Sequence, residues 1–272
     1  MSFNKLVILI VFIEVKYPEC VGSQNVFENI NSFLFDNAKE NFEFIDLTQY
    51  PQEEQFCNIG QPSWFVSNEQ LLNRGKCGTY MDSKYYIHSR GDYVDEIPLT
   101  KLIVPMIIAD VSSQVHDDSN FVLYKHNLDY FINNYFGLNQ PCVVIFKFGW
   151  SKYYRDPKTY FGISDKDESH RKYPGISEEV AKWIVSAYKN VVGVGVDSPS
   201  VDAGSSNSSI VHETLVKAGL YVIENIKLDQ YLPDAWCTAA VLPTKVKKTV
   251  TAPIRLIAIC PKSRMHLLML ST

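Results

Sequence analysis

Residues 177–196 read SEEVAKWIVSAYKNVVGVGV, and this stretch decides the fold class. Ser177 followed by two acidic residues is the pattern of a helix start, because a hydroxyl caps the first turn and negative charge is favoured there. Apolar residues then recur at spacings of three and four, which predicts one buried helix face made of Val180, Trp183, Ile184, Ala187 and Tyr188. The valine-rich run 191–196 that follows predicts a strand. A helix leading directly into an apolar strand is typical of α/β proteins.

The same two patterns recur along the chain. Five other runs rich in Val and Ile predict strands at 102–111, 142–146, 220–223, 238–242 and 254–260. Most of them do not alternate between apolar and polar residues, so we expect strands covered on both faces. Two further helices are predicted, one at 210–217 with Gly219 as its stop, and one from a face shared by Leu128, Phe131, Ile132, Tyr135 and Phe136. Because no repeat or linker divides the chain, the sequence predicts one α/β domain.

The composition is that of a soluble globular protein. Of the 272 residues, 46% are hydrophobic and 21% are charged, and 15 Phe with 16 Tyr supply ample apolar surface for a core. The net charge of −4 argues against a nucleic-acid partner, because phosphate binding requires a basic surface. No apolar run reaches the ~18 residues of a membrane span, so no span is predicted.

The first 23 residues have the pattern of a secretory signal peptide. Lys5 precedes eight unbroken apolar residues, 6–13, and residues 21–23 are small enough for a cleavage site. A buried β-strand is the alternative, because the run is short and β-branched. We predict a signal peptide at 1–23, a domain at 24–272 and a secreted, extracellular protein.

Six cysteines and one glycosylation sequon bear on that prediction. No two cysteines are spaced as CxxC, which argues against a zinc ribbon and a thioredoxin motif. Cys142 and Cys260 lie in apolar runs and are predicted to be buried small hydrophobic residues. The pairing of the others stays open, in particular that of Cys57, Cys77 and Cys237. Asn207-Ser208-Ser209 is a sequon in a polar run, which predicts an exposed loop and, in a secreted chain, a glycoprotein.

The segment 75–86, GKCGTYMDSKYY, is the most unusual in the chain. It places a glycine–threonine turn, an acid and three tyrosines within a few residues, and its plain interpretation is a turn that enters a strand. Elsewhere the sequence has no GxGxxG, GxxxxGK[ST], HExxH or GxSxG motif, and its six histidines are scattered. These patterns alone do not define a reaction.

This segment resembles HxGTHxDxPxH, the signature of the putative cyclase family, which includes bacterial kynurenine formamidases and isatin hydrolase. Seven other stretches resemble motifs of that family in the same order: 46–49, 91–99, 147–150, 173–177, 193–202, His212 with Glu224-Asn225, and 253–255. Each motif is weak alone, but their shared order covers about residues 44–260. The resemblance implies a single domain with a mixed β-sheet flanked by helices, and a homo-oligomer.

The resemblance also implies a metal centre, most of whose signature ligands are replaced here. Family enzymes hold zinc or manganese through the signature His and Asp residues, joined in some members by a distant His and Glu. They hydrolyse small amides, such as N-formyl groups or strained lactams. The signature histidines fall at Lys76, Tyr80 and Tyr86, and the signature proline at Lys84. The acid is retained as Asp82, and the distant pair as His212 and Glu224.

These replacements leave two interpretations of the site. Asp82, His212 and Glu224 remain as candidate ligands, a set that suits Mn²⁺ or Fe²⁺ better than Zn²⁺. Alternatively, an ammonium at Lys76 neutralises the two carboxylates in place of a metal, either in a functional pocket or in a purely structural ion cluster. Tyr80 and Tyr86 would then add two phenols that hydrogen-bond a ligand or those carboxylates. We expect no cofactor, with residual zinc or manganese as the alternative.

Three functions therefore stay open. The first is a secreted pseudoenzyme that binds a small molecule or a partner. The second is a metal-independent cyclase, lyase or hydrolase, with Tyr80 or Tyr86 as acid, His212 or Asp82 as base, and Lys76 stabilising an oxyanion. The third is amide hydrolysis with a residual metal. The aromatic residues near the signature point to a flat, aromatic ligand: Tyr80, Tyr85, Tyr86, Trp64 and Phe65.

Overall fold

The computed structural model describes residues 38–50, 78–83, 92–134, 140–163 and 170–262. Contacts divide the chain into two units, Met1–Phe42 and Glu43–Thr272. Of the first unit, residues 38–41 are described as helical and Phe42 begins a strand. The predicted signal peptide and the cysteines at 20, 57 and 77 lie outside the described residues, as do Lys76 and Tyr86.

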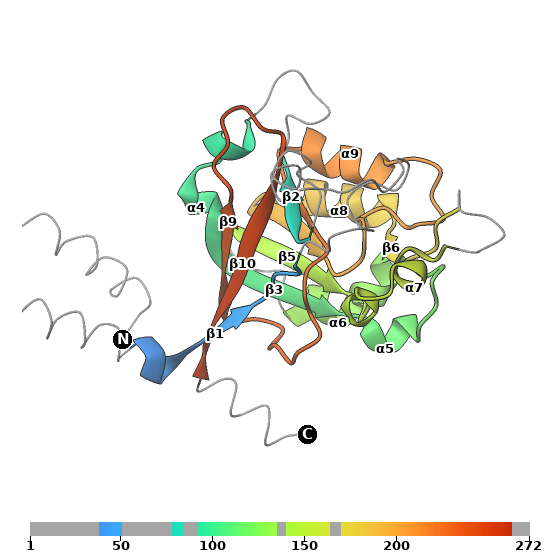
Figure 1. Cartoon of the computed structure of the whole chain (residues 1–272), viewed down its shortest axis with the longest axis horizontal. Helices are drawn as coiled ribbons and strands as arrows, with labels where there is room; N and C mark the ends of the chain where they lie inside the picture. Colours follow the sequence, from blue (N-terminus) through green and yellow to red (C-terminus); the bar gives the residue numbers. More distant parts are fainter. Residues whose placement is uncertain (1–37, 51–77, 84–91, 135–139, 164–169, 263–272) are drawn as a thin grey trace, which may run out of the picture. The chain divides into compact units, whose positions relative to one another are not determined.

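The main sheet of the described residues closes into a barrel (Figure 1). Its strands are β1 (Phe42–Asp46), β2 (Tyr80–Asp82), β3 (Ile103–Asp110), β5 (Cys142–Lys147), β7 (Val191–Val196), β8 (Tyr221–Glu224), β9 (Cys237–Pro243) and β10 (Thr251–Pro261). Their order is β1-β10-β2-β8-β7-β5-β3-β9, and β10 also pairs with β9. Closure depends on the length of β10, because residues 251–253 pair with β2 and residues 254–259 pair with β9.

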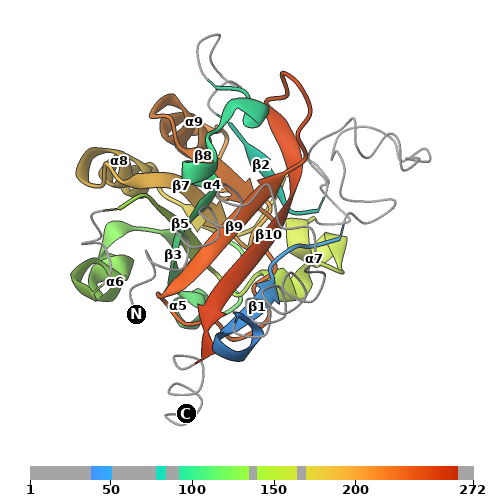
Figure 2. The same cartoon turned by 90° about the vertical axis from the view of Figure 1, so that its left-hand side faces the viewer.

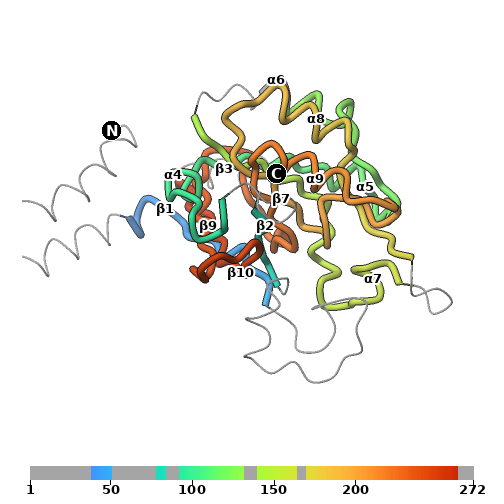
Figure 3. Tube along the Cα trace, turned by 90° about the horizontal axis from the view of Figure 1, so that it is seen from above, coloured from blue at the N-terminus to red at the C-terminus, as the bar shows by residue number. Residues whose placement is uncertain are grey.

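The sheet is mixed, as the resemblance implied. Strands β8, β7, β5 and β3 are parallel neighbours, whereas β2, β9 and β10 pair antiparallel to their partners. The helices α6 (Asp129–Asn134), α8 (Glu178–Ala187) and α9 (Ile210–Lys217) lie on the side of the parallel strands. Figures 2 and 3 show them on the opposite side of the barrel from β10.

Shorter elements connect these parts. They are α4 (Leu99–Leu102), α5 (Ser112–Val115) and α7 (Pro157–Phe161), the 3-10 turns at 94–96, 125–128 and 151–153, and a small parallel pair of β4 (Val122–Leu123) with β6 (Gly175–Ile176). No helix among the described residues is long and apolar enough to cross a membrane.

Two cores explain why the strands are apolar on both faces. Within β3, Met106 and Ile108 point into the barrel, whereas Ile107 and Ala109 pack under the helices. Successive side chains of a strand point to opposite faces, so a strand between two cores has no polar face. The prediction of strands covered on both faces is therefore confirmed for β3, β5, β7 and β8. It is wrong for β10, whose burial alternates and whose Arg255 is exposed, because no described helix covers that side.

Most predicted elements are confirmed, with two corrections. Helix α8 starts after Ser177, whose hydroxyl accepts a hydrogen bond from the Val180 N–H at 3.2 Å. Ala187 was predicted to be in its buried face but is exposed, because the helix ends there. Cys260 is buried as predicted, yet it is bonded to Cys237 rather than a free small residue. Cys142 is a buried free thiol, as predicted.

Candidate functional site

The antiparallel pair β2–β8 places three candidate residues on one face of the sheet. Tyr80 lies opposite Glu224, and Asp82 follows two residues after Tyr80, so all three side chains point the same way. The intervening Met81 and Ile223 point into the barrel core instead. The three polar side chains therefore face the helix layer, where α9 supplies His212.

The three retained ligand candidates meet at this place. The distance from His212 Nε2 to Asp82 Oδ2 is 3.5 Å, and from His212 Nδ1 to Glu224 Oε1 it is 3.7 Å. One ligand atom from each residue lies within 4.8 Å of the others. All three residues are buried, with exposures of 0% for Asp82, 6% for His212 and 2% for Glu224. The structure thus brings together residues that are 142 positions apart in sequence.

This donor set fits a divalent cation. One imidazole and two carboxylates are ligands that Mn²⁺, Fe²⁺ and Zn²⁺ accept, and burial of two carboxylates is costly unless hydrogen bonds or a cation compensate them. The expectation of no metal is thus not supported by the described residues, and the alternative of a residual metal fits them. The predicted competing cation, Lys76, lies outside the described residues.

Tyr80 is hydrogen-bonded to one of the three ligand candidates. Its hydroxyl donates a hydrogen bond to Glu224 Oε2, and the residue is 6% exposed. Burial raises the pKa of the phenol well above its usual value of 10, and the nearby Glu224 carboxylate raises it further. Tyr80 is therefore a neutral hydrogen-bond donor to Glu224 in the metal-free chain.

The other oxygen of Glu224 is held by a loop that follows β7. Glu224 Oε1 accepts hydrogen bonds from the Ser200 hydroxyl at 2.9 Å and from the Val201 N–H at 3.1 Å. Together with Tyr80, three donors therefore satisfy this carboxylate. Glu224, at the end of β8, is thereby linked to strand β2 and to this loop.

The same loop positions His212. Asp202 accepts hydrogen bonds from the Val211 N–H at 2.8 Å and from the His212 N–H at 3.2 Å, so it caps helix α9 from a distance. The residue at the usual capping position, Ser209, makes no side-chain capping bond. Burial raises the pKa of Asp202, and the two hydrogen bonds oppose that shift. The sequence resemblance included this loop as a family motif, but Ser200 and Asp202 were not predicted to be site residues.

A second hydrogen-bond network fixes the turn that precedes β2. Asn225 has a left-handed backbone, with φ of 58°, and its side-chain amide donates to the Gly78 carbonyl at 2.9 Å. Its carbonyl accepts from the Thr79 hydroxyl at 2.7 Å, and its side-chain oxygen accepts from the Tyr160 hydroxyl at 2.9 Å. Because Asn225 directly follows Glu224, this network sets the position of β2 against the end of β8. Tyr160 had no recognisable signal in the sequence.

The charge of Glu224 also acts on two other phenols, those of Tyr160 and Tyr173. Burial raises the pKa of Tyr160 and of Tyr173, and the charge of Glu224 adds to both shifts. Aromatic surfaces are thus present at the site, although only Tyr80 of the aromatic residues that suggested an aromatic ligand lies within the described residues.

Asp197 holds the backbone of the motif at 147–150 through hydrogen bonds. Its carboxylate accepts hydrogen bonds from the N–H groups of Phe148 at 2.7 Å, Trp150 at 2.8 Å and Ser151 at 3.3 Å. Burial nevertheless raises the pKa of Asp197 to about 6. Gly149 provides the left-handed turn, with φ of 72°, that lets these amides converge. We interpret this as a structural contact that fixes the ends of β5 and β7.

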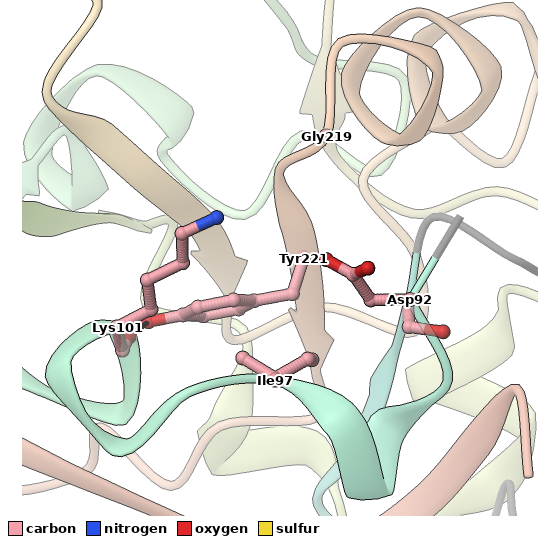
Figure 4. Close-up of a pocket in the computed structure, with 6 residues that line it drawn as sticks. Asp92, Ile97, Lys101, Gly219 and Tyr221 are labelled. Carbon is pink, nitrogen blue, oxygen red and sulfur yellow. Dashed lines mark hydrogen bonds between the residues drawn. The ribbon is translucent and has the colours of Figure 1, made fainter.

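A pocket lies beside the Asp82–Val222 end of the β2–β8 pair. It is lined by Ser83, Asp92, Ile97, Lys101, Gly219 and Tyr221, and Figure 4 shows the Tyr221 ring beside Lys101. The Tyr221 hydroxyl donates to the Lys101 carbonyl at 2.9 Å. None of the three ligand candidates lines this pocket, so it is separate from the site.

Comparisons with known proteins agree with the sequence resemblance. A family model described as a putative cyclase matches residues 40–203. A kynurenine formamidase of Polaromonas naphthalenivorans is 38% identical over 71 residues, which is 26% of this chain and 31% of that protein. An isatin hydrolase of Roseibium aggregatum is 22% identical over 260 residues, which is 92% of this chain and 94% of that protein.

Solved structures share the fold. Isatin hydrolase A from Ralstonia solanacearum has a TM-score of 0.67 and 19% identity, over 89% of this chain and 99% of that chain. Isatin hydrolase A from Labrenzia aggregata, solved with benzyl benzoate bound, has a TM-score of 0.65 and 20% identity, over 87% of this chain and 100% of that chain. Another structure, described as a potential metal-dependent hydrolase with cyclase activity, has a TM-score of 0.58 and 19% identity, over 80% of this chain and 98% of that chain. The predicted α/β fold is confirmed.

Proposed function

Because this chain belongs to the putative cyclase family and is related to kynurenine formamidases and isatin hydrolase, we propose that it is a small-molecule-binding pseudoenzyme of that family. One observation carries the proposal. Tyr80, which stands where the family signature has a histidine, donates a hydrogen bond to Glu224, one of the retained ligand candidates. A histidine that binds metal in the family signature is thus replaced by a tyrosine whose hydroxyl is hydrogen-bonded to another ligand candidate, Glu224.

The hydrogen bonds of Glu224 weaken any metal site here. A catalytic zinc has three protein ligands and one open position for water. A cation bound at Glu224 Oε2 competes with the Tyr80 hydroxyl for the electron density of that oxygen, and a hydrogen bond to a charged group contributes about 1.5–3 kcal/mol. Since 1.4 kcal/mol is a factor of ten, we expect cation affinity roughly 10- to 100-fold below that of a site without this bond.

A residual metal remains compatible with the proposal. Asp82, His212 and Glu224 would hold it, and a bound divalent ion supplies a more acidic water and a polarised carbonyl. In this chain Ser200 and Val201 would continue to orient Glu224 through its other oxygen. Asp202 would continue to hold the backbone of His212.

An active hydrolase of small amides, lactams or aromatic substrates is the second candidate. The observation that favours it is the approach of the three ligand atoms to within 4.8 Å in a buried site. A metal-independent version would use Lys76, Tyr80, Tyr86 and His212, of which Tyr80 and His212 lie within the described residues. Tyr80 is a poor general acid there, because its raised pKa keeps the proton on the phenol.

The ligand class that we propose is small and aromatic. The relative from Labrenzia aggregata was solved with benzyl benzoate bound, and in this chain Glu224 lies near enough to the phenols of Tyr80, Tyr160 and Tyr173 to raise the pKa of each. Aromatic rings favour edge-to-face or offset contacts with one another. Benzyl benzoate is therefore a suitable first probe, with its binding measured by the shift of the thermal unfolding midpoint.

A hydrolysis assay tests the proposal directly. The full chain is loaded with Mn²⁺ or Zn²⁺ and offered N-formyl aryl amides and lactams, beside the variants Glu224→Gln and His212→Ala. Exposed Glu179→Gln serves as the matched control. We expect no hydrolysis above the level of the two site variants. Metal-dependent turnover that both site variants abolish, and that Glu179→Gln retains, would overturn the pseudoenzyme in favour of the hydrolase.

A further inference from the structure

The loop between Asp202 and helix α9 carries a feature that the proposed function does not use. Residues 207–209 form the sequon Asn-Ser-Ser, and residues 205–210 are all exposed. No hydrogen bond to the Asn207 side chain occurs within the described part of the chain, whereas Ser206 and Ser208 bond to each other across it, with the Ser206 hydroxyl donating to the Ser208 carbonyl at 2.8 Å. The amide of Asn207 therefore projects from a short turn into solvent.

The Ser209 hydroxyl, which completes the sequon, does not cap helix α9. Ser209 occupies the N-cap position of α9 but makes no side-chain capping bond, because Asp202 accepts from the N–H groups of Val211 and His212 instead. N-glycosylation requires a Ser or Thr hydroxyl two residues after the asparagine. Both side chains that define the sequon are thus dispensable for the fold.

The disulfide gives an independent argument for the compartment. Thr238 pairs with Ile259 in the antiparallel ladder of β9 and β10, which places Cys237 directly opposite Cys260. The two are disulfide-bonded, with exposures of 1% and 0%, and they join the strands whose pairing closes the barrel. Disulfides of this structural kind form and persist in oxidising compartments such as the lumen of the secretory pathway, and they are rare in the cytosol.

We propose that Asn207 is an N-glycosylation site, used while the chain passes through an oxidising secretory compartment. The donor class is an oligosaccharide linked to a lipid pyrophosphate. The Asn207 side-chain nitrogen bonds to the anomeric carbon of the first sugar, the bond from that carbon to the pyrophosphate oxygen breaks, and the nitrogen loses one proton to a base. The lipid pyrophosphate leaves with the bonding electron pair.

Disulfide formation in the same compartment balances in a similar way. The thiols of Cys237 and Cys260 lose two protons and two electrons, and a protein disulfide of that compartment accepts both electrons. Cys142 does not compete for the pairing, because it is buried and burial raises the pKa of its thiol to about 11, which suppresses the reactive thiolate.

Expression of the full chain with its own N-terminus in cultured animal cells tests the proposal. Four forms are compared: the native chain, Asn207→Gln, Ser209→Ala and Ser209→Thr. Each is treated with an amidase that removes N-glycans and converts the glycosylated asparagine to aspartate. The peptide that contains residue 207 is then examined by mass spectrometry.

We expect the native chain and Ser209→Thr to lose the mass of one N-glycan and to show aspartate at position 207. Asn207→Gln and Ser209→Ala should show no change in mass. Alkylation before and after reduction should identify Cys237 and Cys260 as the oxidised pair. A chain that enters the secretory pathway with unmodified Asn207, or a chain that stays in the cytosol, would overturn the proposal. Neither result bears on ligand binding at the β2–β8 site.

Discussion

Removal of the Tyr80 hydroxyl should have opposite effects on the metal-free protein and on cation binding. In Tyr80→Phe the ring keeps its packing, but Glu224 Oε2 loses its donor in a buried setting. A hydrogen bond to a charged group contributes about 1.5–3 kcal/mol, so the metal-free variant should lose about 2 kcal/mol of unfolding free energy. The same oxygen becomes available to a cation, and its affinity should rise roughly 10- to 100-fold.

Two measurements on the same samples check this. Urea denaturation of chelator-treated protein gives the change in unfolding free energy, and titration calorimetry with Mn²⁺ gives the change in affinity. Tyr221→Phe is a matched control, because Tyr221 is also buried and its hydroxyl also makes one hydrogen bond, to the Lys101 carbonyl at 2.9 Å. That variant should lose stability without any change in Mn²⁺ affinity. The reasoning fails if Tyr80→Phe binds Mn²⁺ no more tightly than the native chain, or if both variants change it equally.

Three further predictions concern the support of the site and the barrel. Asp202→Ala should cost about 1–2 kcal/mol through loss of the α9 cap and should weaken Mn²⁺ binding, whereas Ser209→Ala should change neither quantity in urea titration and calorimetry. The pKa of Asp197 is raised to about 6 from 3.8, so between pH 3.8 and pH 6 the folded state binds a proton that the unfolded state has lost. Stability should therefore fall by about 2 kcal/mol as pH rises from 4 to 7, and Asp197→Asn should lack that part of the slope. Replacing Cys237 and Cys260 together by Ala should lower the unfolding free energy by about 3 kcal/mol, because the bond closes a loop of 23-residue separation; equal urea midpoints would contradict this.

The sequence predicted the parallel half of the barrel well, for a physical reason. Strands buried between two cores are apolar at every position, so runs such as 142–146 stand out without any knowledge of their neighbours. Helix α9 was predicted with its observed bounds, because its apolar spacing and the glycine that follows are both local signals.

Features that depend on the register between distant segments were not predictable. The Cys237–Cys260 bond requires that β9 and β10 pair with Thr238 opposite Ile259, and nothing local in either strand specifies that pairing. Closure of the barrel likewise depends on β10 changing partners along its length. The cap that Asp202 supplies to α9 replaces a local Ser209 cap, so the local pattern gave no reason to look for it.

The sequence resemblance predicted the three ligand candidates of the site, but most of the hydrogen bonds that hold them were not predicted. The resemblance named Asp82, His212 and Glu224, and the structure brings them together as the family motif implied. A hydrogen bond from Tyr80 to one of the two carboxylates was one of the predicted alternatives, and the register that places Tyr80 opposite Glu224 appears only in the folded sheet. Tyr80 was predicted to act as an acid or as a phenol that bonds a ligand or the carboxylates, and the structure shows its bond to Glu224.

Glu224 has a structural role that does not require metal. Its carboxylate accepts from Tyr80 on β2 and from Ser200 and Val201 in the loop after β7, so it joins three segments of the fold. Glu224→Gln keeps the shape but turns one acceptor into a donor, which faces either the phenol or the Val201 N–H. Leaving a buried donor unsatisfied costs about 1–3 kcal/mol.

That cost should appear in urea denaturation of the chelator-treated chain, where no metal contributes. Exposed Glu179→Gln should leave the unfolding free energy unchanged. If Glu224→Gln is instead as stable as the native chain without metal and destabilised only in its presence, then Glu224 is retained for a cation and the pseudoenzyme interpretation loses its main support. Loss of stability in the absence of metal would instead support the proposed pseudoenzyme, because the carboxylate then stabilises the fold without a cation.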